Sequence, residues 1–283
     1  MLVSALLLHA HAQSGTPGNP RIPYVPTPQE VVDRMLQMAR LTPNDYLIDL
    51  GSGDGRLVVT AAVRHGARGF GVDINPERVA EAEASALKHK VTDKVAFYQR
   101  DLFATDFSQA TVISMYLLPR VNMALRPKLL ALKPGTRIVS HDFDMGDWKA
   151  DQHVHMEARS KYEGAGGYSD VYLWVVPARV AGEWRWEIPL RGQLVHYTAA
   201  LSQTFQVVSG QVTVNGRKSL VQSAKMNGDE LQLTFVVDLG AGAIKHELRG
   251  RVAGGQMRGV AALAGTRGHG RYEWHAEQAV AER

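Results

Sequence analysis

Residues 46–56 read Tyr-Leu-Ile-Asp-Leu-Gly-Ser-Gly-Asp-Gly-Arg, and this stretch decides the fold. A short apolar run comes first, glycines follow at 51, 53 and 55, and a helix pattern then begins at Leu57 and is expected to end at Gly66. Glycine permits a tight turn and lets the backbone approach a ligand closely. The stretch therefore predicts a strand, a ligand-binding loop and a helix in that order.

The spacing and charge of this loop limit its ligand. A dinucleotide fingerprint needs a third glycine three positions after the second, and this chain has Arg56 there. A phosphate-binding P-loop would end in Gly-Lys-Ser/Thr, which the sequence lacks. Asp49 and Asp54 flank the turn, and two carboxylates would repel a bound pyrophosphate. The loop favours a cationic or hydroxyl-rich ligand without phosphate, such as S-adenosylmethionine.

An acidic residue completes the predicted cofactor site. Asp73 ends the predicted strand 69–72, roughly 20 residues after the first glycine, where an acid accepts hydrogen bonds from ribose hydroxyls. A solvated acid at a strand end is the structural alternative. The candidate cofactor-binding residues of this region are Asp49, Gly51, Ser52, Gly53, Gly55 and Asp73.

The motif resembles the class I, seven-β-strand S-adenosylmethionine-dependent methyltransferases. Tyr24-Val25-Pro26-Thr27-Pro28, placed before a helix and followed by the loop at 49–56, is similar to the lysine methyltransferases of mitochondrial inner-membrane proteins. The targets of that family are the ATP synthase c subunit and the adenine nucleotide translocase. The resemblance covers roughly residues 22–178. It implies a Rossmann-like seven-stranded methyltransferase sheet with helices on both faces, S-adenosylmethionine as cofactor and a protein lysine as acceptor.

Two further cofactor contacts follow from the resemblance. The segment before the first helix closes over the cofactor in that family, which implies that Thr27 lies near its methionine end. Thr27-Pro28-Gln29-Glu30 also fits a capping box, a purely structural role. Asp101 follows the third predicted strand, 95–98, where class I enzymes place a group against the adenine amino group. A helix N-cap is the alternative for Asp101.

The acceptor side is predicted at the ends of the next two strands. The strand 111–115 runs into Tyr116, without the Asn/Asp-Pro-Pro-aromatic motif of amino-directed DNA and glutamine methylases. Tyr116 orients an amine, lines the channel or only packs. The strand 137–140 ends in His141 and Asp142. Either of them is a candidate to take the proton that a lysine loses before in-line SN2 methyl transfer, a reaction that needs mainly alignment.

A pair of histidines raises the question of a metal. His153 and His155 fall on one face of a strand. A half-exposed strand has the same spacing, and no further residues have diagnostic ligand spacing, so no metal is predicted. This strand, 153–158, and the strand 171–176 are joined by the glycine-rich stretch 164–167, and their hairpin completes the seven-stranded sheet.

The pattern changes beyond Pro177. Short alternating segments, among them 204–208 and 211–214, are separated by turn signals such as Asn215-Gly216, Asn227-Gly228 and Gly254-Gly255. They predict a small antiparallel β-sandwich or barrel at 179–283, after a methyltransferase domain at 24–178. Substrate docking, dimerisation and simple stabilisation are its open roles.

The amino-acid composition excludes some classes of binding partner and of chemistry. The 283 residues carry a formal net charge of +4 without a Lys/Arg run, so no nucleic-acid surface is predicted. The chain has no cysteine, which excludes disulfides and thiolate chemistry. Residues 1–23 are predicted to form a signal-like segment and a flexible arm. Leu2–Leu8 and Ala10-His11-Ala12 resemble the end of a secretory signal and are too short to span a membrane. Export to the periplasm and a cytoplasmic location, where S-adenosylmethionine is made, are the two alternatives.

Three functions remain open from the sequence. The first is a protein-lysine N-methyltransferase, and the second is a small-molecule methyltransferase with the same cofactor site. The third is a non-catalytic cofactor-binding or periplasmic binding protein whose β domain does the work. The methyl acceptor and the oligomeric state are not decided by the sequence.

Overall fold

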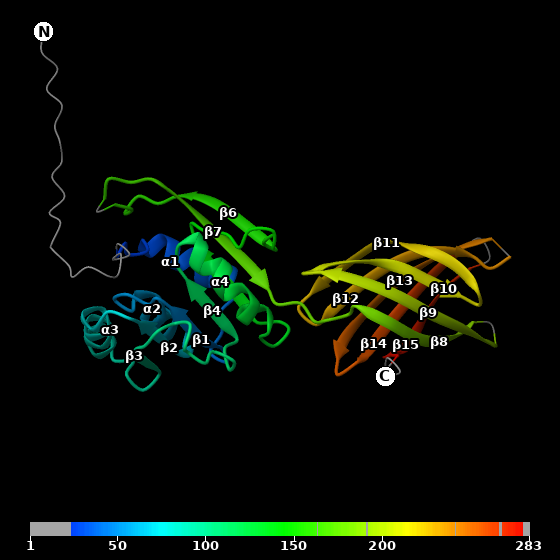
Figure 1. Cartoon of the computed structure of the whole chain (residues 1–283), viewed down its shortest axis with the longest axis horizontal. Coiled ribbons are helices and arrows are strands. Elements are labelled where there is room, and N and C mark those ends of the chain that lie inside the picture. The colour runs from blue at the N-terminus through cyan, green and yellow to red at the C-terminus, as the bar shows by residue number, and fades with distance from the viewer. Residues whose placement is uncertain (1–23, 163, 191, 241, 266–267, 280–283) are drawn as a thin grey trace, which may run out of the picture.

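The computed structural model describes residues 24–162, 164–190, 192–240, 242–265 and 268–279. The predicted signal-like segment and arm, residues 1–23, lie outside this range. The described chain has an α/β part followed by a β-barrel, which stand side by side in Figure 1. The predicted fold class is confirmed.

The α/β part is built on a seven-stranded sheet with the order β3-β2-β1-β4-β5-β7-β6. The first five strands are parallel, and β7 is antiparallel to both β5 and β6. The chain order reverses between β1 and β4, the place where open α/β sheets bind ligands. The seven strands are β1 Tyr46–Leu50, β2 Arg68–Asp73, β3 Val95–Gln99, β4 Val112–Met115, β5 Arg137–His141, β6 Gln152–Glu157 and β7 Tyr168–Val175.

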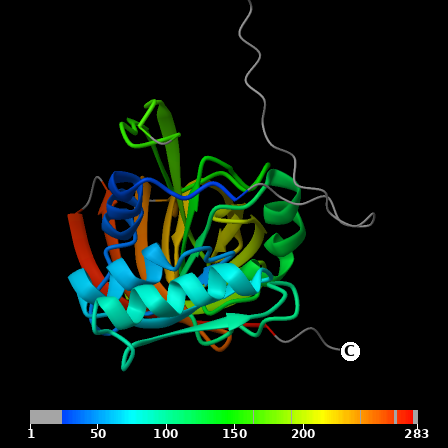
Figure 2. The ribbon, with the colours of Figure 1, turned by 90° about the vertical axis from the view of Figure 1, so that its left-hand side faces the viewer.

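Helices cover both faces of this sheet. Leu47 of β1 is buried in one core together with apolar residues of the first three helices, and its neighbour Ile48 is buried in the other with Leu125 and Leu129 of the fourth. In Figure 2, α1 in blue and α4 in green lie on opposite sides of the α/β part. The helices are α1 Gln29–Met38, α2 Arg56–His65, α3 Pro76–Lys88 and α4 Pro119–Leu130. Among the helices of the described residues, none combines the length and apolar character that crossing a bilayer requires.

The helix ends show which local signals hold. α2 starts one residue earlier than predicted, at Arg56, and ends at Gly66 with φ 69° as expected. Asn75 caps α3 by accepting the amide hydrogen of Glu77. The capping box at Thr27 is wrong, because Pro28 is the N-cap of α1 and no side chain caps this end.

The C-terminal part is a closed eight-stranded barrel in the order β10-β11-β12-β13-β14-β15-β8-β9, which decides between the predicted sandwich and barrel. The predicted turns at 215–216, 227–228 and 254–255 lie where consecutive strands meet. The strand predicted at 204–208 is wrong, because Phe205 and Gln206 form a turn there. The strands are β8 Gly182–Leu190, β9 Gln193–Thr204, β10 Val207–Val214, β11 Arg217–Asn227, β12 Glu230–Asp238, β13 Ala243–Ala253, β14 Gln256–Gly265 and β15 Gly268–Gln278.

Side chains fill the barrel, and two of its neighbouring strands pair over only a short length. Trp186, Tyr197 and Trp274 are buried and pack as one aromatic cluster, with ring centroids 5.2 and 5.7 Å from that of Trp186. β8 and β15 pair only at three positions, from Ala276↔Trp186 to Gln278↔Trp184. A groove of about 1140 Å³ lies over this seam. Closure of the barrel therefore rests more on the aromatic core than on ladder hydrogen bonds here.

The turn between β9 and β10 fastens the barrel to the α/β part. The Phe205 ring stacks on Trp148 with centroids 5.8 Å apart. The Trp148 indole N–H donates to Gln206 Oε1 at 3.0 Å, and Gln206 Nε2 donates to the Lys149 carbonyl at 2.7 Å. Stacking and paired hydrogen bonds thus fix this contact.

This contact predicts a stability effect. Phe205→Ala removes the ring from Trp148 and is expected to lower the free energy of unfolding by on the order of 1–3 kcal/mol. Thermal unfolding followed by calorimetry measures it, with Val207→Ala as control because Val207 is 63% exposed two residues away. Equal unfolding temperatures for the two variants would show that the ring contributes nothing.

Candidate active site

The glycine loop is folded back on β2. The amides of Gly51 and Ser52 both donate to the Val72 carbonyl at 2.9 Å. Gly53 has φ 51°, and a Cβ there would lie 2.4 Å from the Tyr24 ring. A Cβ at Gly55 would instead meet the interior of the α/β part. Gly51 and Gly53 therefore shape the ligand loop, whereas the structure gives Gly55 a packing role.

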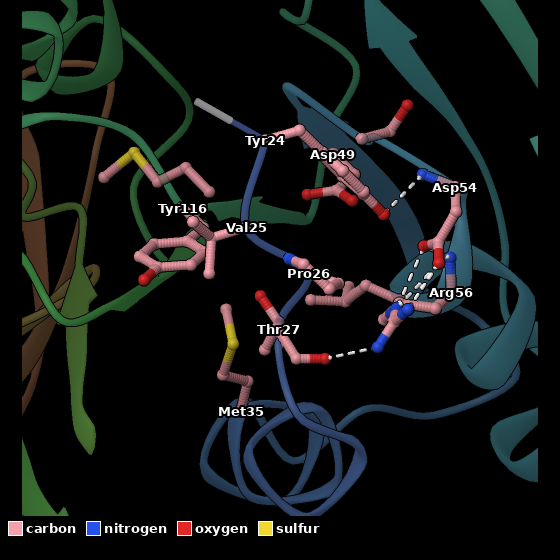
Figure 3. A pocket seen from close by; sticks show the side chains of 12 residues that line it. Tyr24, Val25, Pro26, Thr27, Met35, Asp49, Asp54, Arg56 and Tyr116 are labelled. Carbon is pink, nitrogen blue, oxygen red and sulfur yellow. Dashed lines mark hydrogen bonds and ion pairs between the residues drawn. The ribbon is translucent and has the colours of Figure 1, made fainter. Parts of the chain in front are cut away.

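A strap, residues Tyr24–Pro28, forms one wall of a pocket at this loop. Figure 3 shows the strap running between Tyr116 on one side and Arg56 on the other. The Arg56 guanidinium donates to the Thr27 carbonyl at 2.9 Å, and the Tyr24 hydroxyl accepts from the Asp54 amide at 3.4 Å. The pocket is lined by Tyr24, Val25, Pro26, Thr27, Met35, Asp49, Ser52, Asp54, Arg56, Leu57, Met115 and Tyr116.

The two acidic residues beside the loop, Asp49 and Asp54, have different partners. The prediction that both present a negative charge to the ligand is therefore wrong for Asp54. Asp54 pairs with Arg56, with Nε to Oδ1 at 2.9 Å. Burial raises the pKa of Asp54, but the hydrogen bonds and charge of Arg56 outweigh burial and lower it. The charge of Asp54 is therefore neutralised within the protein, and Asp49 is the acid left for a ligand.

Asp49 is buried at the end of β1. Its Oδ1 accepts the hydroxyl hydrogen of Ser114 on β4 at 2.7 Å. Burial raises the pKa of Asp49 to about 7, an effect that this hydrogen bond opposes. A cationic group placed beside Asp49 would offset the desolvation of its charged form.

Ser52 and Asp73 support the fit of an adenosyl cofactor. The Ser52 hydroxyl is buried and has no hydrogen-bond partner among the described residues, which leaves it to a ligand. Asp73 accepts the Gly53 amide on Oδ2 at 3.0 Å and the Asn75 amide on Oδ1 at 2.9 Å. These bonds orient the carboxylate at the end of β2 while lone pairs remain for ribose hydroxyls.

Asp101 lies after β3 and is exposed. Its Oδ1 accepts the Phe103 amide at 2.8 Å, so the carboxylate closes a local turn and caps no helix. The adenine contact implied by the resemblance stays a prediction.

The predicted acceptor residues meet at the ends of β4 and β5. The Tyr116 hydroxyl donates to Asp142 Oδ2 at 3.1 Å. Burial and the charge of Asp142 raise the pKa of Tyr116, which keeps the phenol protonated as a donor. Asp142 has φ 60°, a strained conformation for a residue other than glycine and one that clusters at functional sites.

His141 contacts the strap and packs against the Tyr116 ring, with the ring centroids 3.9 Å apart. Its Nδ1 is 3.2 Å from the Thr27 hydroxyl, and its Nε2 is 2.9 Å from the Ser169 hydroxyl. Burial lowers the pKa of His141 to about 4, so the ring is neutral near pH 7. Thr27 thus links the pocket wall to β5.

The paired histidines of β6 have a common protein partner. His153 Nε2 lies 2.7 Å and His155 Nδ1 3.1 Å from the same oxygen of Asp170 on β7. Both rings stack on tyrosines, His153 on Tyr172 and His155 on Tyr168. The geometry is that of a partly exposed cross-strand cluster.

Known proteins share this chain's α/β sequence. The model of the ANTKMT methyltransferase domain matches residues 49–152. A protein-lysine N-methyltransferase of Saccharolobus islandicus (strain REY15A) is 43% identical over 159 residues, which are 56% of this chain and 95% of the archaeal protein. The chain belongs to the ANTKMT methyltransferase family. The predicted methyltransferase activity and the S-adenosylmethionine cofactor are confirmed.

Two other matches differ in how much of the known protein this chain spans. The adenine nucleotide translocase lysine N-methyltransferase of Mus musculus is 34% identical over 46% of this chain, which spans 56% of the mouse protein. A crystal structure described as an RNA methyltransferase from Salinibacter ruber, in complex with S-adenosyl-L-homocysteine, is 50% identical. That match covers 55% of this chain and 96% of the other, with a TM-score of 0.49.

Sequence reasoning missed two residues of this methyltransferase site. Ser114 is a polar residue inside a strand that is buried on both faces, a signal that would have flagged it as a partner of a buried polar group. Lys161 lies in the glycine-rich connection between β6 and β7 and reaches Asp142 at 2.8 Å. No motif or spacing in the sequence predicts the contact of Lys161 with Asp142, because only the folding of the loop brings Lys161 to the end of β5.

Asp49→Asn is expected to raise the stability of the fold and to weaken binding of the cofactor. The folded pKa lies above the unfolded value of 3.8, so Asp49 contributes stability below about pH 4 that is lost as pH rises through 7. The variant keeps a hydrogen-bond acceptor for Ser114 and should gain on the order of 2–4 kcal/mol above pH 7. Chemical denaturation at pH 4.5 and 8 measures the gain, and calorimetry with S-adenosylhomocysteine should show weaker binding. A gain that does not depend on pH would contradict the assignment.

Gly53→Ala is expected to open the strap. The new Cβ would collide with the Tyr24 ring, so affinity for S-adenosylhomocysteine should fall by about tenfold or more, equivalent to at least about 1.4 kcal/mol. Gly135→Ala is the control, because Gly135 is also left-handed, at φ 91°, but has nothing within 4 Å of its Cβ position. Similar stability losses with unequal binding losses are expected from calorimetry. Equal binding losses would remove the role given to Tyr24.

Proposed function

We propose that this methyltransferase transfers a methyl group to the side-chain amine of a protein lysine. The archaeal relative that this chain spans almost completely carries that activity in its name. The observation that carries the proposal is the Asp142 carboxylate, held by Tyr116 at the same sheet edge as the cofactor pocket. A carboxylate there attracts an ammonium group before reaction.

Different residues of the pocket contact different parts of the cofactor in this proposal. The cofactor supplies an electrophilic methyl group on a sulfonium when bound. We assign cation and amino-group contacts to Asp49, the ribose to Asp73 and a hydrogen bond to Ser52. Gly51 and Gly53 let the backbone approach, Thr27 faces the methionine end from the strap, and Asp101 faces the adenine. The strap excludes water from this side of the pocket.

The acceptor amine needs alignment and the loss of one proton. Asp142 binds the incoming ammonium and takes its proton, which leaves the neutral nitrogen that would accept the methyl group of the bound cofactor. Both nitrogens of His141 already lie within hydrogen-bond distance of hydroxyls, so we propose a positioning role for it. Tyr116 orients the carboxylate by donating to it. Proximity and alignment supply most of the rate in such a reaction.

We also propose a division of labour along the chain. Residues 24–178 form the catalytic domain, and residues 179–283 form a second domain whose first role is substrate docking. Support comes from the family match, which ends at residue 152 and lies within the α/β part. The barrel's fixed contact through Phe205 would hold a docked protein in constant relation to the pocket.

Transfer of labelled methyl groups to a cell lysate tests the function. Separation into protein, RNA and small-molecule fractions, followed by amino-acid analysis of the protein, should place the label on lysine. Label in RNA or in a metabolite would assign a different acceptor. Failure to bind S-adenosylhomocysteine would favour the non-catalytic alternative.

Asp142→Asn tests the acceptor chemistry. Asparagine tolerates the left-handed conformation and removes the charge. It keeps an acceptor at only one of the two oxygen positions, which now accept from Tyr116 and Lys161 on Oδ2 and from the Asp170 amide on Oδ1. We expect kcat/KM for protein lysine to fall by about 100-fold or more, with affinity for S-adenosylhomocysteine unchanged. Asp144→Asn, an exposed acid two residues away, is the matched control. Unchanged rates in both Asp142→Asn and His141→Ala would exclude these two residues from the reaction.

A further inference from the structure

A lysine of the chain itself is buried on the acceptor side. Lys161 lies in the connection between β6 and β7, and its side chain is only 5% exposed although its neighbours Ser160 and Tyr162 are exposed. A lysine is almost never buried unless its ammonium group is paired. The position of Lys161 therefore reflects a site that binds this group.

That site has the groups that recognise an alkylammonium ion. Lys161 Nζ donates to Asp142 Oδ2 at 2.8 Å and to the Tyr168 carbonyl at 2.7 Å. It also lies 5.4 Å from the centre of the Tyr162 ring, within the range of a cation–π contact. Charge-assisted hydrogen bonds of this kind are the strong ones.

The site adjoins the cofactor pocket. Asp142 Oδ2, which accepts from Lys161, also accepts from the hydroxyl of Tyr116, a residue that lines the pocket. The loop that carries Lys161 is held against α1 by Glu30, whose carboxylate accepts from the Ser160 amide and hydroxyl at 2.9 and 2.6 Å. Exposed side chains make this second contact, so the loop is fastened by bonds that water can replace.

We infer that Asp142 and the Tyr168 carbonyl form the ammonium subsite for the acceptor lysine, and that Lys161 is an internal occupant which the acceptor displaces. The inference rests on the proposed function, because it takes protein lysine as the acceptor. Lys161 offers the same four-carbon stem and ammonium group as a substrate lysine. An occupant that fills the subsite in about 90% of molecules weakens apparent acceptor affinity about tenfold.

Lys161→Met separates an occupant from a mere counter-ion. Methionine keeps an unbranched apolar side chain and removes the charge. If Lys161 is an occupant, n-butylammonium should bind the variant about tenfold more tightly than the wild type, measured by calorimetry with S-adenosylhomocysteine present. KM for protein lysine should fall as well. Adding Asp142→Asn to this variant should abolish the gain, and Lys88→Met, an exposed lysine on α3, should bind n-butylammonium like the wild type.

Unchanged or weaker n-butylammonium binding in a folded Lys161→Met variant would overturn the inference. Removing one partner of a buried ion pair is destabilising, so a measurement on the wild type stands beside it. Saturating n-butylammonium should speed hydrogen exchange of the amides at 158–162, and unchanged exchange there would overturn the inference too. The lysate experiment distinguishes this inference from the proposed function. Label on lysine together with unchanged n-butylammonium binding in Lys161→Met would reject only the role of Lys161 as an occupant. Label on RNA or on a metabolite would reject the proposed function.

Discussion

The Arg56 guanidinium joins the parts on which the site depends. It pairs with Asp54 in the glycine loop and donates to the Thr27 carbonyl of the strap. The Thr27 hydroxyl lies against His141 at the end of β5. One cation therefore links the cofactor loop, the pocket wall and the acceptor side. Because each of these contacts is a directional hydrogen bond, displacement of the strap is expected to disturb both halves of the site.

The site also retains features that are unfavourable for folding alone. Asp49 is buried, and its hydrogen-bond partner is the neutral hydroxyl of Ser114. The buried Ser52 hydroxyl has no hydrogen-bond partner among the described residues, and the backbone of Asp142 has a left-handed conformation. Conflicts between local preference and fold are expected at functional positions. Here they gather at the carboxyl ends of β1 and β5, the two strands that flank β4 next to the point where the strand order reverses. Their common location is a stronger functional signal than any one of them.

The local structure around the glycine loop was more predictable than the contacts at the ends of β4 and β5. The loop at 51–55 and Asp73 depend on local turn chemistry and on spacing between adjacent strands, which a single sequence displays. The barrel was predicted only as one of two all-β alternatives, because alternating strands of either form look alike until the first and last strands pair. The turn at Phe205 was missed, since a phenylalanine with φ 54° carries no turn signal and is held there by Trp148.

The sequence by itself determined the mainly parallel α/β sheet, the glycine loop, the acid at the end of β2 and the all-β character of the C-terminal part. Periodicity, glycine positions and strand ends encode these features over short distances along the chain. Only the tertiary structure decided that Thr27 meets His141, 114 positions away, and that Lys161 fills the carboxylate site of Asp142. Such contacts depend on how whole elements pack, and the residues that make them carry no pattern of their own.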